Sequence, residues 1–327
     1  MSTIPKPPGA TPARSYEIVR FHGELLQPAA ARLIASAAKS ADTAGAFLET
    51  AGAMGIDLGG FWGSVEHRKG GTIVREVALA IPGSGGALMV FTSEPRGSAS
   101  EAELAEVVAR ACSEAPKRCT MAQALLLPRE RAVERALGLS GFGLIADLAY
   151  LRRPIGLAPE HGLERSGGLP AGVRARLVAD LPGGYRQSRA RLTTALERSY
   201  EGTLDCPELC AMRTASEALE SHRAAGAFDP ALWWLIEHQG APAGVLLFSP
   251  SVDGEAVELV YVGVAPELRG LGLGRTLLRM GLEAVCDTEA QWVTCAVDLR
   301  NAPARKLYAQ AGFRRFGLRR AFVRSLA

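Results

Sequence analysis

The stretch ELRGLGLGRTLL, Glu267–Leu278, places three glycines at alternate positions directly before a run that reads as an amphipathic helix. Glycine inside a helix or strand costs roughly 0.5–1 kcal/mol relative to alanine, because its backbone loses more conformational freedom on folding. Three such residues so close together therefore indicate a backbone shape that the protein needs. A glycine-rich turn ahead of a helix lets several N–H groups converge on one point, where the helix dipole also favours negative charge. The stretch predicts a phosphate-binding turn.

Two common nucleotide motifs do not fit this turn. Its glycines, Gly270, Gly272 and Gly274, are not spaced as G-x-G-x-x-G, and no Lys-Ser or Lys-Thr pair follows in P-loop register. The pattern that fits is Q/R-x-x-G-x-G/A, which begins at Arg269 and follows a predicted strand ending V-x-V-x-P at Pro266.

A second signature lies further along the chain. The segment NAPARKLYAQAGF, 301–313, reads Asn-x-x-Ala-x-x-Leu-Tyr-x-x-x-Gly-Phe. With both signatures in this order, residues 173–327 resemble the GNAT superfamily of N-acetyltransferases. The resemblance implies transfer of an acetyl group to a primary amine by direct attack, with acetyl-CoA as the co-substrate and no metal.

The same resemblance assigns the catalytic roles. Glu258 is the expected general base, which removes the amine proton directly or through water, and Tyr308 is the expected proton donor to the coenzyme thiolate. A phenol with a pKa near 10 would protonate a thiolate whose conjugate acid lies near 8.5, which is uphill by about one unit. A surface carboxylate and a core aromatic remain the alternatives at these two positions.

Alternation along ELVYVGV, 258–264, predicts which side chains share one face of this strand. Successive side chains of a strand point to opposite faces of the sheet. The pattern therefore places Glu258 on the same face as Val260, Val262 and Val264.

The coenzyme is expected along this strand and the glycine turn. The strand backbone would pair with the pantetheine, the turn would wrap the pyrophosphate, and Asn301 would cap its helix and reach the coenzyme. The cofactor-binding residues that the resemblance implies are Val262, Gly263, Val264, Arg269, Gly270, Leu271, Gly272, Leu273, Gly274, Arg275 and Asn301. Capping alone remains the alternative role for Asn301.

The acceptor side is expected in YEGTLDCPELC, 200–210, between two predicted helices. The resemblance places the acceptor beside this segment, where Asp205 and Glu208 are available to attract a cationic amine. The alternative is a loop followed by a helix start, with Pro207 early in the first turn and Glu208 favourable to the helix dipole.

The two halves of the chain look duplicated. Gly141-Phe142 and Gly312-Phe313 are separated by 312 − 141 = 171 residues, and the same shift superimposes an ordered series of segments between the halves. The predicted fold is therefore α/β, with two tandem GNAT-like domains that each hold a mixed, mostly antiparallel sheet flanked by helices.

The first domain is expected to be a degenerate copy. We predict domains at 1–152 and 173–327, joined by a linker at 153–172 that is rich in glycine, proline and charge. Opposite the glycine turn the first copy reads SEPRGSASEAEL, with the single glycine Gly97, and opposite the catalytic tyrosine stands Leu137. Such a segment is not expected to hold a pyrophosphate, so the first copy would support the second or wall its cleft.

Composition excludes several other classes. In this chain of 327 residues no apolar run approaches the roughly 20 residues of a membrane span, and the first residues do not read as a secretory signal. The net charge of +3 is too small to indicate nucleic acid, and the six cysteines form no CxxC pair. We therefore expect a cytoplasmic protein whose partner is a small-molecule amine, with no nucleic acid, membrane or metal.

Two other functions share the predicted coenzyme site. One is a sensor that binds acyl-CoA without turnover, which needs neither Glu258 nor Tyr308. The other is an acyltransferase that acts on a protein amine, which needs an open groove for the acceptor.

Overall fold

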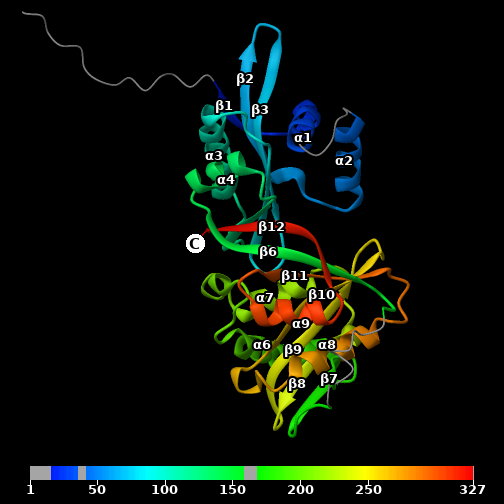
Figure 1. Cartoon of the computed structure of the whole chain (residues 1–327). Helices are drawn as coiled ribbons and strands as arrows, with labels where there is room; N and C mark the ends of the chain where they lie inside the picture. Colours follow the sequence, from blue (N-terminus) through cyan, green and yellow to red (C-terminus); the bar gives the residue numbers. More distant parts are fainter. Residues whose placement is uncertain (1–15, 36–41, 158–167, 327) are drawn as a thin grey trace, which may run out of the picture. The chain divides into compact units, whose positions relative to one another are not determined.

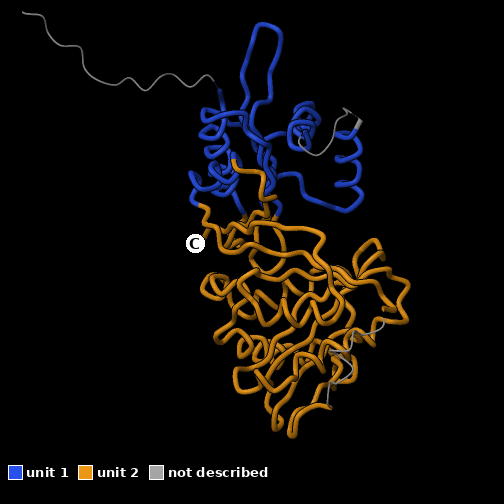
Figure 2. Tube along the Cα trace, viewed as in Figure 1, with its two compact units in different colours: residues 1–81, 90–115, 132–141 blue, residues 82–89, 116–131, 142–327 orange. Residues whose placement is uncertain are grey.

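The computed structural model describes residues 16–35, 42–157 and 168–326 (Figure 1). Contacts divide the chain into two compact units, which Figure 2 colours separately. The first unit consists of residues 1–81, 90–115 and 132–141, and the second consists of 82–89, 116–131 and 142–327.

These units do not follow the predicted boundary. Strand β6 (Gly143–Pro154) lies in the second unit, where it pairs with two strands of the C-terminal half. Part of the predicted linker, 158–167, lies outside the described residues. The copies at 1–152 and 173–327 are defined by the sequence repeat and not by contacts, so their boundaries stay a prediction.

The first unit contains a short antiparallel sheet and helices. Strand β2 pairs with β1 on one side and with β3 on the other, and α3 packs against β2. The elements are β1 (Glu17–Arg20), α1 (Leu26–Ile34), α2 (Asp42–Ala53), β2 (Phe61–Arg68), β3 (Gly71–Pro82), α3 (Ser98–Ser113) and α4 (Arg131–Leu139), with the 3-10 helices η1 (Gly23–Leu25) and η2 (Leu58–Gly60).

The second unit is built on a larger sheet. Its strands lie in the order β5 (Met121–Leu126), β12 (Arg314–Ser325), β6, β11 (Trp292–Asp298), β10 (Ala256–Val264), β9 (Ala241–Pro250), β8 (Trp233–His238) and β7 (Val173–Leu177). The start of β4 (Ala87–Thr92) pairs in parallel with β5, and β10 pairs in parallel with β11. The other neighbours in this sheet are antiparallel.

Helices cover both faces of this sheet. The helices are α6 (Gly184–Tyr200), α7 (Ala215–Arg223), α8 (Leu273–Ala284) and α9 (Ala302–Gln310), with the 3-10 helices η3 (Pro207–Ala211), η4 (Pro230–Leu232) and η5 (Pro266–Leu268). Leucines of α6 and α7 pack with Trp233 and Leu247 on one face. Leucines of α8 and the ring of Tyr308 on α9 pack with Trp234 and Phe248 on the other. Neighbouring residues of one strand therefore serve two cores, as the pleat requires.

The duplication is confirmed by the element bounds. A shift of 171 residues carries α4 onto α9, because 131 + 171 = 302, and it carries β6 onto β12, because 143 + 171 = 314. The same shift carries the start of β5 onto the start of β11, because 121 + 171 = 292. The last strands are exchanged between the copies, since β6 pairs with β11 while β12 pairs with β5.

No helix among the described residues is both long and apolar enough to span a membrane.

Candidate functional site

A bulge in β10 shapes the site. Leu259 pairs with Phe248 of β9 and Tyr261 pairs with the next residue, Leu247, so Val260 has no partner in the register. An extra residue of this kind disrupts the ladder locally and increases the twist of the strand. The side chains of Val260 and Tyr261 consequently both pack on the α6 and α7 face.

The predicted alternation along β10 is therefore wrong. Val257 and Leu259 pack in the core under α8 and α9, which turns Glu258 toward the opposite face. Val262 and Val264 also pack against the α8 and α9 core, although the pattern put them on the face of Glu258. One extra residue shifts the period of two by one position, so every side chain beyond it changes face.

The strands next to the bulge separate and leave a cavity. Pairing between β10 and β11 ends at Glu258 and Thr294, while β10 continues to Val264 and β11 to Asp298. A cavity of about 480 Å³ opens in this wedge. Its lining residues are Ser199, Gly202, Thr203, Leu204, Asp205, Leu259, Val260, Tyr261, Val262, Gly263, Val264, Arg269, Gly270, Gly274, Ala296, Val297, Asn301, Pro303, Ala304, Leu307 and Tyr308.

The glycine turn forms one end of this wedge. Gly270 and Gly272 both have φ of +77°, a left-handed conformation that glycine adopts without steric cost, and Gly272 is the N-cap of α8. No atom lies within 4 Å of a Cβ built on either residue. No acceptor among the described residues meets the N–H groups of residues 270–274. Five unpaired donors at a helix N-terminus form a site for an anion.

The structure separates the predicted coenzyme residues into two groups. Those that line the cavity are Val262, Gly263, Val264, Arg269, Gly270, Gly274 and Asn301. The side chains of Leu271, Leu273 and Arg275 are turned elsewhere: the first is exposed, the second is buried in the core, and the third donates to Gln310 Oε1 at 2.7 Å. Gly272 and Leu273 can thus serve a ligand only through backbone groups, and the exposed side chain of Leu271 lies outside the cavity lining.

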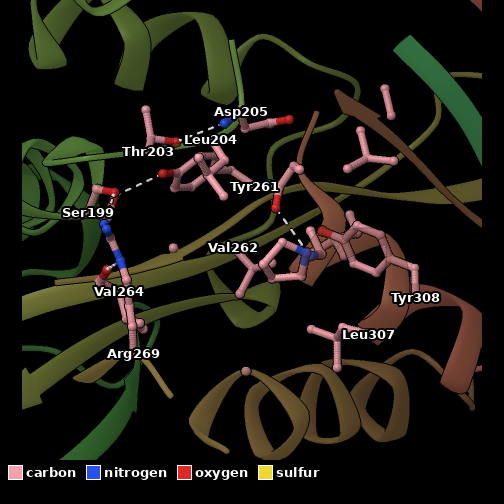
Figure 3. Close-up of a pocket in the computed structure, with 18 of the residues that line it drawn as sticks. Ser199, Thr203, Leu204, Asp205, Tyr261, Val262, Val264, Arg269, Leu307 and Tyr308 are labelled. Carbon is pink, nitrogen blue, oxygen red and sulfur yellow. Dashed lines mark hydrogen bonds between the residues drawn. The ribbon is translucent and has the colours of Figure 1, made fainter. Parts of the chain in front are cut away.

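Arg269 braces the backbone around the wedge. Its guanidinium donates to the carbonyl oxygens of Val264 at 3.2 Å, Gly202 at 3.3 Å and Ser199 at 3.0 Å (Figure 3). These bonds tie the end of β10 to the end of α6. The side chain of Arg269, the first residue of the motif, is therefore hydrogen bonded to backbone carbonyls of the protein. The spacing of the motif did not reveal these bonds.

The carbonyl of Val264 shows which backbone groups of β10 face away from β9. Since it accepts from Arg269, it points away from β9. Backbone groups two residues apart in a strand point the same way, so those of Val262 are directed to the open edge as well. This unpaired edge is available to a ligand that pairs as an additional strand would.

Asn301 and Tyr308 lie on the α9 side of the cavity. Asn301 caps α9, because its Oδ1 accepts from the N–H of Ala304 at 3.1 Å. The ring of Tyr308 is buried and lies 5.6 Å from the ring of Phe313. No hydrogen-bond partner for its hydroxyl occurs among the described residues. Burial raises the pKa of this phenol well above its usual value, so it keeps its proton.

Glu258 does not line the cavity. It stands at the last paired position of β10, on the face that also carries Val260, and its side chain is exposed. The protein atoms around the carboxylate still displace enough water to raise its pKa. Two residues of strand span about 7 Å, which separates Glu258 along β10 from the bulge at Val260.

The two predicted acceptor carboxylates differ in their surroundings. Asp205 lines the cavity, and its Oδ1 accepts from the N–H of Asp298 at 2.9 Å. Burial raises its pKa, and the bond from the Asp298 N–H opposes that rise. Glu208 lies outside the cavity in a two-pronged ion pair with Arg300, at 2.7 and 2.9 Å, which lowers its pKa.

A pair of hydroxyl groups lies among the cavity residues that the sequence did not predict. Tyr261 and Ser199 hydrogen bond through their hydroxyls at 3.0 Å on the α6 side of the wedge (Figure 3). A Cβ on Gly263 would lie 2.5 Å from the Tyr261 hydroxyl, so glycine is required there by the position of that ring. The Tyr-x-Gly spacing was visible in the sequence, but the contact between the Tyr261 ring and Gly263 depends on the bulge.

The first copy has carboxylates where the second has glycines. The shift of 171 residues sets Glu101 against Gly272 and Glu103 against Gly274. Both glutamates are buried, and they pair with Arg135 at 2.6 Å and Arg75 at 2.8 Å. Helix α3 begins at Ser98, which corresponds to position 269, so its first turn replaces the glycine turn. These observations agree with the prediction that the first copy does not hold a pyrophosphate.

Comparisons with known proteins agree with this geometry. Residues 196–313 match the acetyltransferase (GNAT) family. A mycothiol acetyltransferase of Beutenbergia cavernae is 33% identical over 196 residues, which cover 56% of this chain and 65% of that protein. The chain thus spans less than two thirds of that relative.

Solved structures show a similar fold. A GCN5-related N-acetyltransferase of Sphaerobacter thermophilus has a TM-score of 0.60 at 20% identity, with 97% of each chain covered. A tandem GNAT protein from the clavulanic acid biosynthesis pathway has a TM-score of 0.50 at 17% identity, with 95% of this chain and 99% of that chain covered. At these identities the likeness concerns the fold alone, and it supports the tandem arrangement.

Proposed function

We propose that this chain transfers the acetyl group of acetyl-CoA to a small-molecule amine in its C-terminal copy, because residues 196–313 match the acetyltransferase (GNAT) family and the fold is similar to that of a tandem GNAT protein. The observation that carries the proposal is the set of unpaired N–H groups at 270–274 beside the wedge of β10 and β11. The N–H groups suit the diphosphate of the coenzyme, and the wedge suits its extended thiol arm.

The residues present fit the coenzyme. The turn offers backbone donors to a pyrophosphate, and open space surrounds the added Cβ positions of Gly270 and Gly272. The edge of β10 at Val262 and Val264 offers peptide groups to the amides of the pantetheine. Asn301 and Ala304 line the wall on the α9 side. When bound, acetyl-CoA supplies an activated thioester.

Acetyl transfer requires a proton acceptor for the amine and a proton donor for the departing sulfur, and this chain has a residue for each role. The amine nitrogen forms a bond to the thioester carbon, and the carbon–sulfur bond breaks. The amine proton passes to Glu258 through water, and a raised pKa makes this carboxylate a better base than an ordinary glutamate. The hydroxyl of Tyr308 donates to the departing sulfur and regains its proton from solvent. Burial raises the pKa of the phenol, which opposes donation, whereas desolvation of the departing thiol in the same cavity raises the thiol pKa, which favours it.

The test is binding of acetyl-CoA to the full chain by titration calorimetry. In the double variant Gly272→Glu with Gly274→Glu, side chains and negative charge fill the turn, as Glu101 and Glu103 do in the first copy. Gly254→Glu is the matched control, since Gly254 has φ of +74°, has no atom within 4 Å of an added Cβ, and lies outside the cavity.

We expect one equivalent to bind to the native chain and to the control, and binding at least 100-fold weaker in the double variant. Absence of binding to the native chain would overturn the proposal and leave the glycines with a purely structural role. Binding without thiol release in any amine screen would instead identify an acyl-CoA sensor.

A further inference from the structure

A second cavity of about 170 Å³ adjoins the wedge. Its walls come from the segment 200–213, from α7 and from strands β6, β10 and β11 of the same unit. It shares Asp205, Val260, Tyr261 and Ala296 with the larger cavity. The two cavities therefore meet at the bulge, on the face that carries Glu258.

Most polar groups in this second cavity are neutral. Burial, together with the charge of Arg213, lowers the pKa of His222 to about 3, so its imidazole is uncharged at neutral pH. Burial raises the pKa of the Cys206 thiol to about 12 and that of Cys210 above its usual value. Among the described residues that line this cavity, the charged side chains are Asp205 and Arg213.

Arg213 is a cationic side chain in the wall of this cavity. No carboxylate among the described residues forms an ion pair with it, and its guanidinium interacts with the neutral hydroxyl of Tyr200. By contrast, Arg300 on the other side of the 203–208 segment is paired with Glu208 and Asp298. A guanidinium that lines a cavity and is paired with a neutral hydroxyl favours an anionic ligand, and its planar fork matches a carboxylate.

Asp205 has one oxygen available for a ligand. Its Oδ1 accepts from the N–H of Asp298, while no donor among the described residues meets Oδ2. The segment around it is held in place, because Asp298 Oδ2 accepts from the N–H of Cys206 at 3.2 Å and Thr203 Oγ1 accepts from the N–H of Asp205 at 3.1 Å. A cationic group at the junction of the cavities would complete the coordination of this carboxylate.

We propose that the second cavity is the acceptor subsite, and that the acceptor is a small amino acid whose amine lies at Asp205 and whose carboxylate is bound by Arg213. The inference rests on the proposed function. It places the amine at the junction, where the wedge presents the thioester, and directs the carboxylate away from it. Glu258, on the face of Val260, then receives the amine proton through water.

The test uses pairs of acceptors that differ only in the carboxylate. Each L-amino acid is compared with its amide, which has nearly the same shape and a larger fraction of free amine, and thiol release from acetyl-CoA is measured with the full chain. We expect kcat/KM for the best amino acid to exceed that for its amide by about 10- to 100-fold, the effect of losing a charged hydrogen-bond partner.

Arg213→Gln should remove this preference by raising KM for the amino acid to that for its amide. Arg223→Gln is the matched control, because Arg223 lies on α7 outside the cavity and pairs with Glu220 at 3.2 Å. Binding of acetyl-CoA to both variants by calorimetry reports that the coenzyme site is intact.

The outcomes separate the two proposals. If acetyl-CoA does not bind to the native chain, the proposed function fails. If it binds, and amides are acetylated as well as amino acids or no amino acid is acetylated, the acceptor inference alone is overturned. A preference for phosphorylated amines over amino acids would also overturn it.

Discussion

Glu258 and Tyr308 approach the wedge between β10 and β11 from opposite faces of the sheet. Glu258 lies on the face covered by α6 and α7, because Val257 and Leu259 on either side of it pack against α8 and α9. Tyr308 belongs to that α8 and α9 core and lines the cavity from α9. In the proposed function this relationship would put the general base and the proton donor on opposite sides of the reacting carbonyl, which suits a direct transfer in which the amine arrives on one side and the thiolate departs on the other.

Glu258→Gln should lower kcat/KM by about 10²- to 10⁴-fold, the usual loss when a general base is removed. In the native chain the carboxylate must be ionised to act, so kcat/KM should fall as the pH drops through its raised pKa, and this limb should vanish in the variant. Steady-state kinetics across pH 5–9 measure both effects. Glu255→Gln, an exposed neighbour before β10, should leave the profile unchanged. An unaltered profile in Glu258→Gln would exclude this residue as the base.

Tyr308→Phe should lower kcat by about 10²-fold with little change in the affinity for acetyl-CoA. The hydroxyl has no partner among the described residues, so its removal leaves the core packing with Phe313 in place. Single-turnover kinetics and thermal unfolding measure the two quantities separately. Tyr185→Phe, which loses a bond to Glu220 outside the cavity, is the control. Full activity in Tyr308→Phe would reduce this tyrosine to a packing residue.

Arg269→Gln should lower the free energy of unfolding by about 1–3 kcal/mol, because a charged donor leaves three carbonyl groups. It should also weaken acetyl-CoA binding, since the end of α6 and the end of β10 are no longer tied together. Urea unfolding and calorimetry provide the measurements. Arg279→Gln removes only a surface pair with Glu283 and should change stability by less than about 0.5 kcal/mol. Equal stability of the two variants would contradict the bracing role.

His222 should make stability depend on pH. Its ring stacks on Tyr261 at 5.3 Å, and its Nε2 lies 3.2 Å from the Tyr200 hydroxyl. Its pKa falls from 6.5 to about 3 on folding, so between these values the unfolded chain binds a proton that the native chain does not. The free energy of unfolding should therefore decrease as the pH falls from 6.5, by up to about 1.4 kcal/mol per unit.

Urea unfolding at several pH values between 4 and 7 measures this slope. His222→Gln should make it shallower, because the titrating group is gone while an amide can still bond to Tyr200. His238→Gln, at the end of β8, is the matched substitution and should keep the native slope. Identical slopes in all three proteins would show that His222 is protonated in the native state.

Much of the fold was accessible from the sequence because its signals are local. The helix that Asn301 was expected to cap corresponds to α9, and Gln239 and Gly240, which join β8 to β9, both have positive φ. Such a hairpin requires a left-handed conformation that glycine provides, so two residues suffice to predict it. The repeat of 171 residues was equally visible, because spacing along a chain needs no tertiary information.

The site was predicted less completely, because its side chains depend on partners distant in the sequence. Glu208 was predicted to attract the acceptor amine, but in the structure its carboxylate is paired with Arg300. Arg213 was not predicted as a site residue, because the cavity that it lines forms only in the folded chain. Val262 and Val264 were predicted on the same face of β10 as Glu258, and they lie on the opposite face. The bulge that moves them arises from pairing with β9, which the sequence of β10 alone does not reveal.

By itself, the sequence determined the glycine turn, the capped helix at Asn301 and the duplicated order of elements, since each follows from backbone preferences within a few residues or from spacing. The tertiary structure alone decided which strands exchange partners, which arginine braces carbonyls and which lines a cavity, and where β10 separates from β11. These features arise from contacts between segments far apart in the chain, whose free energy depends on burial and on the partners that folding brings together.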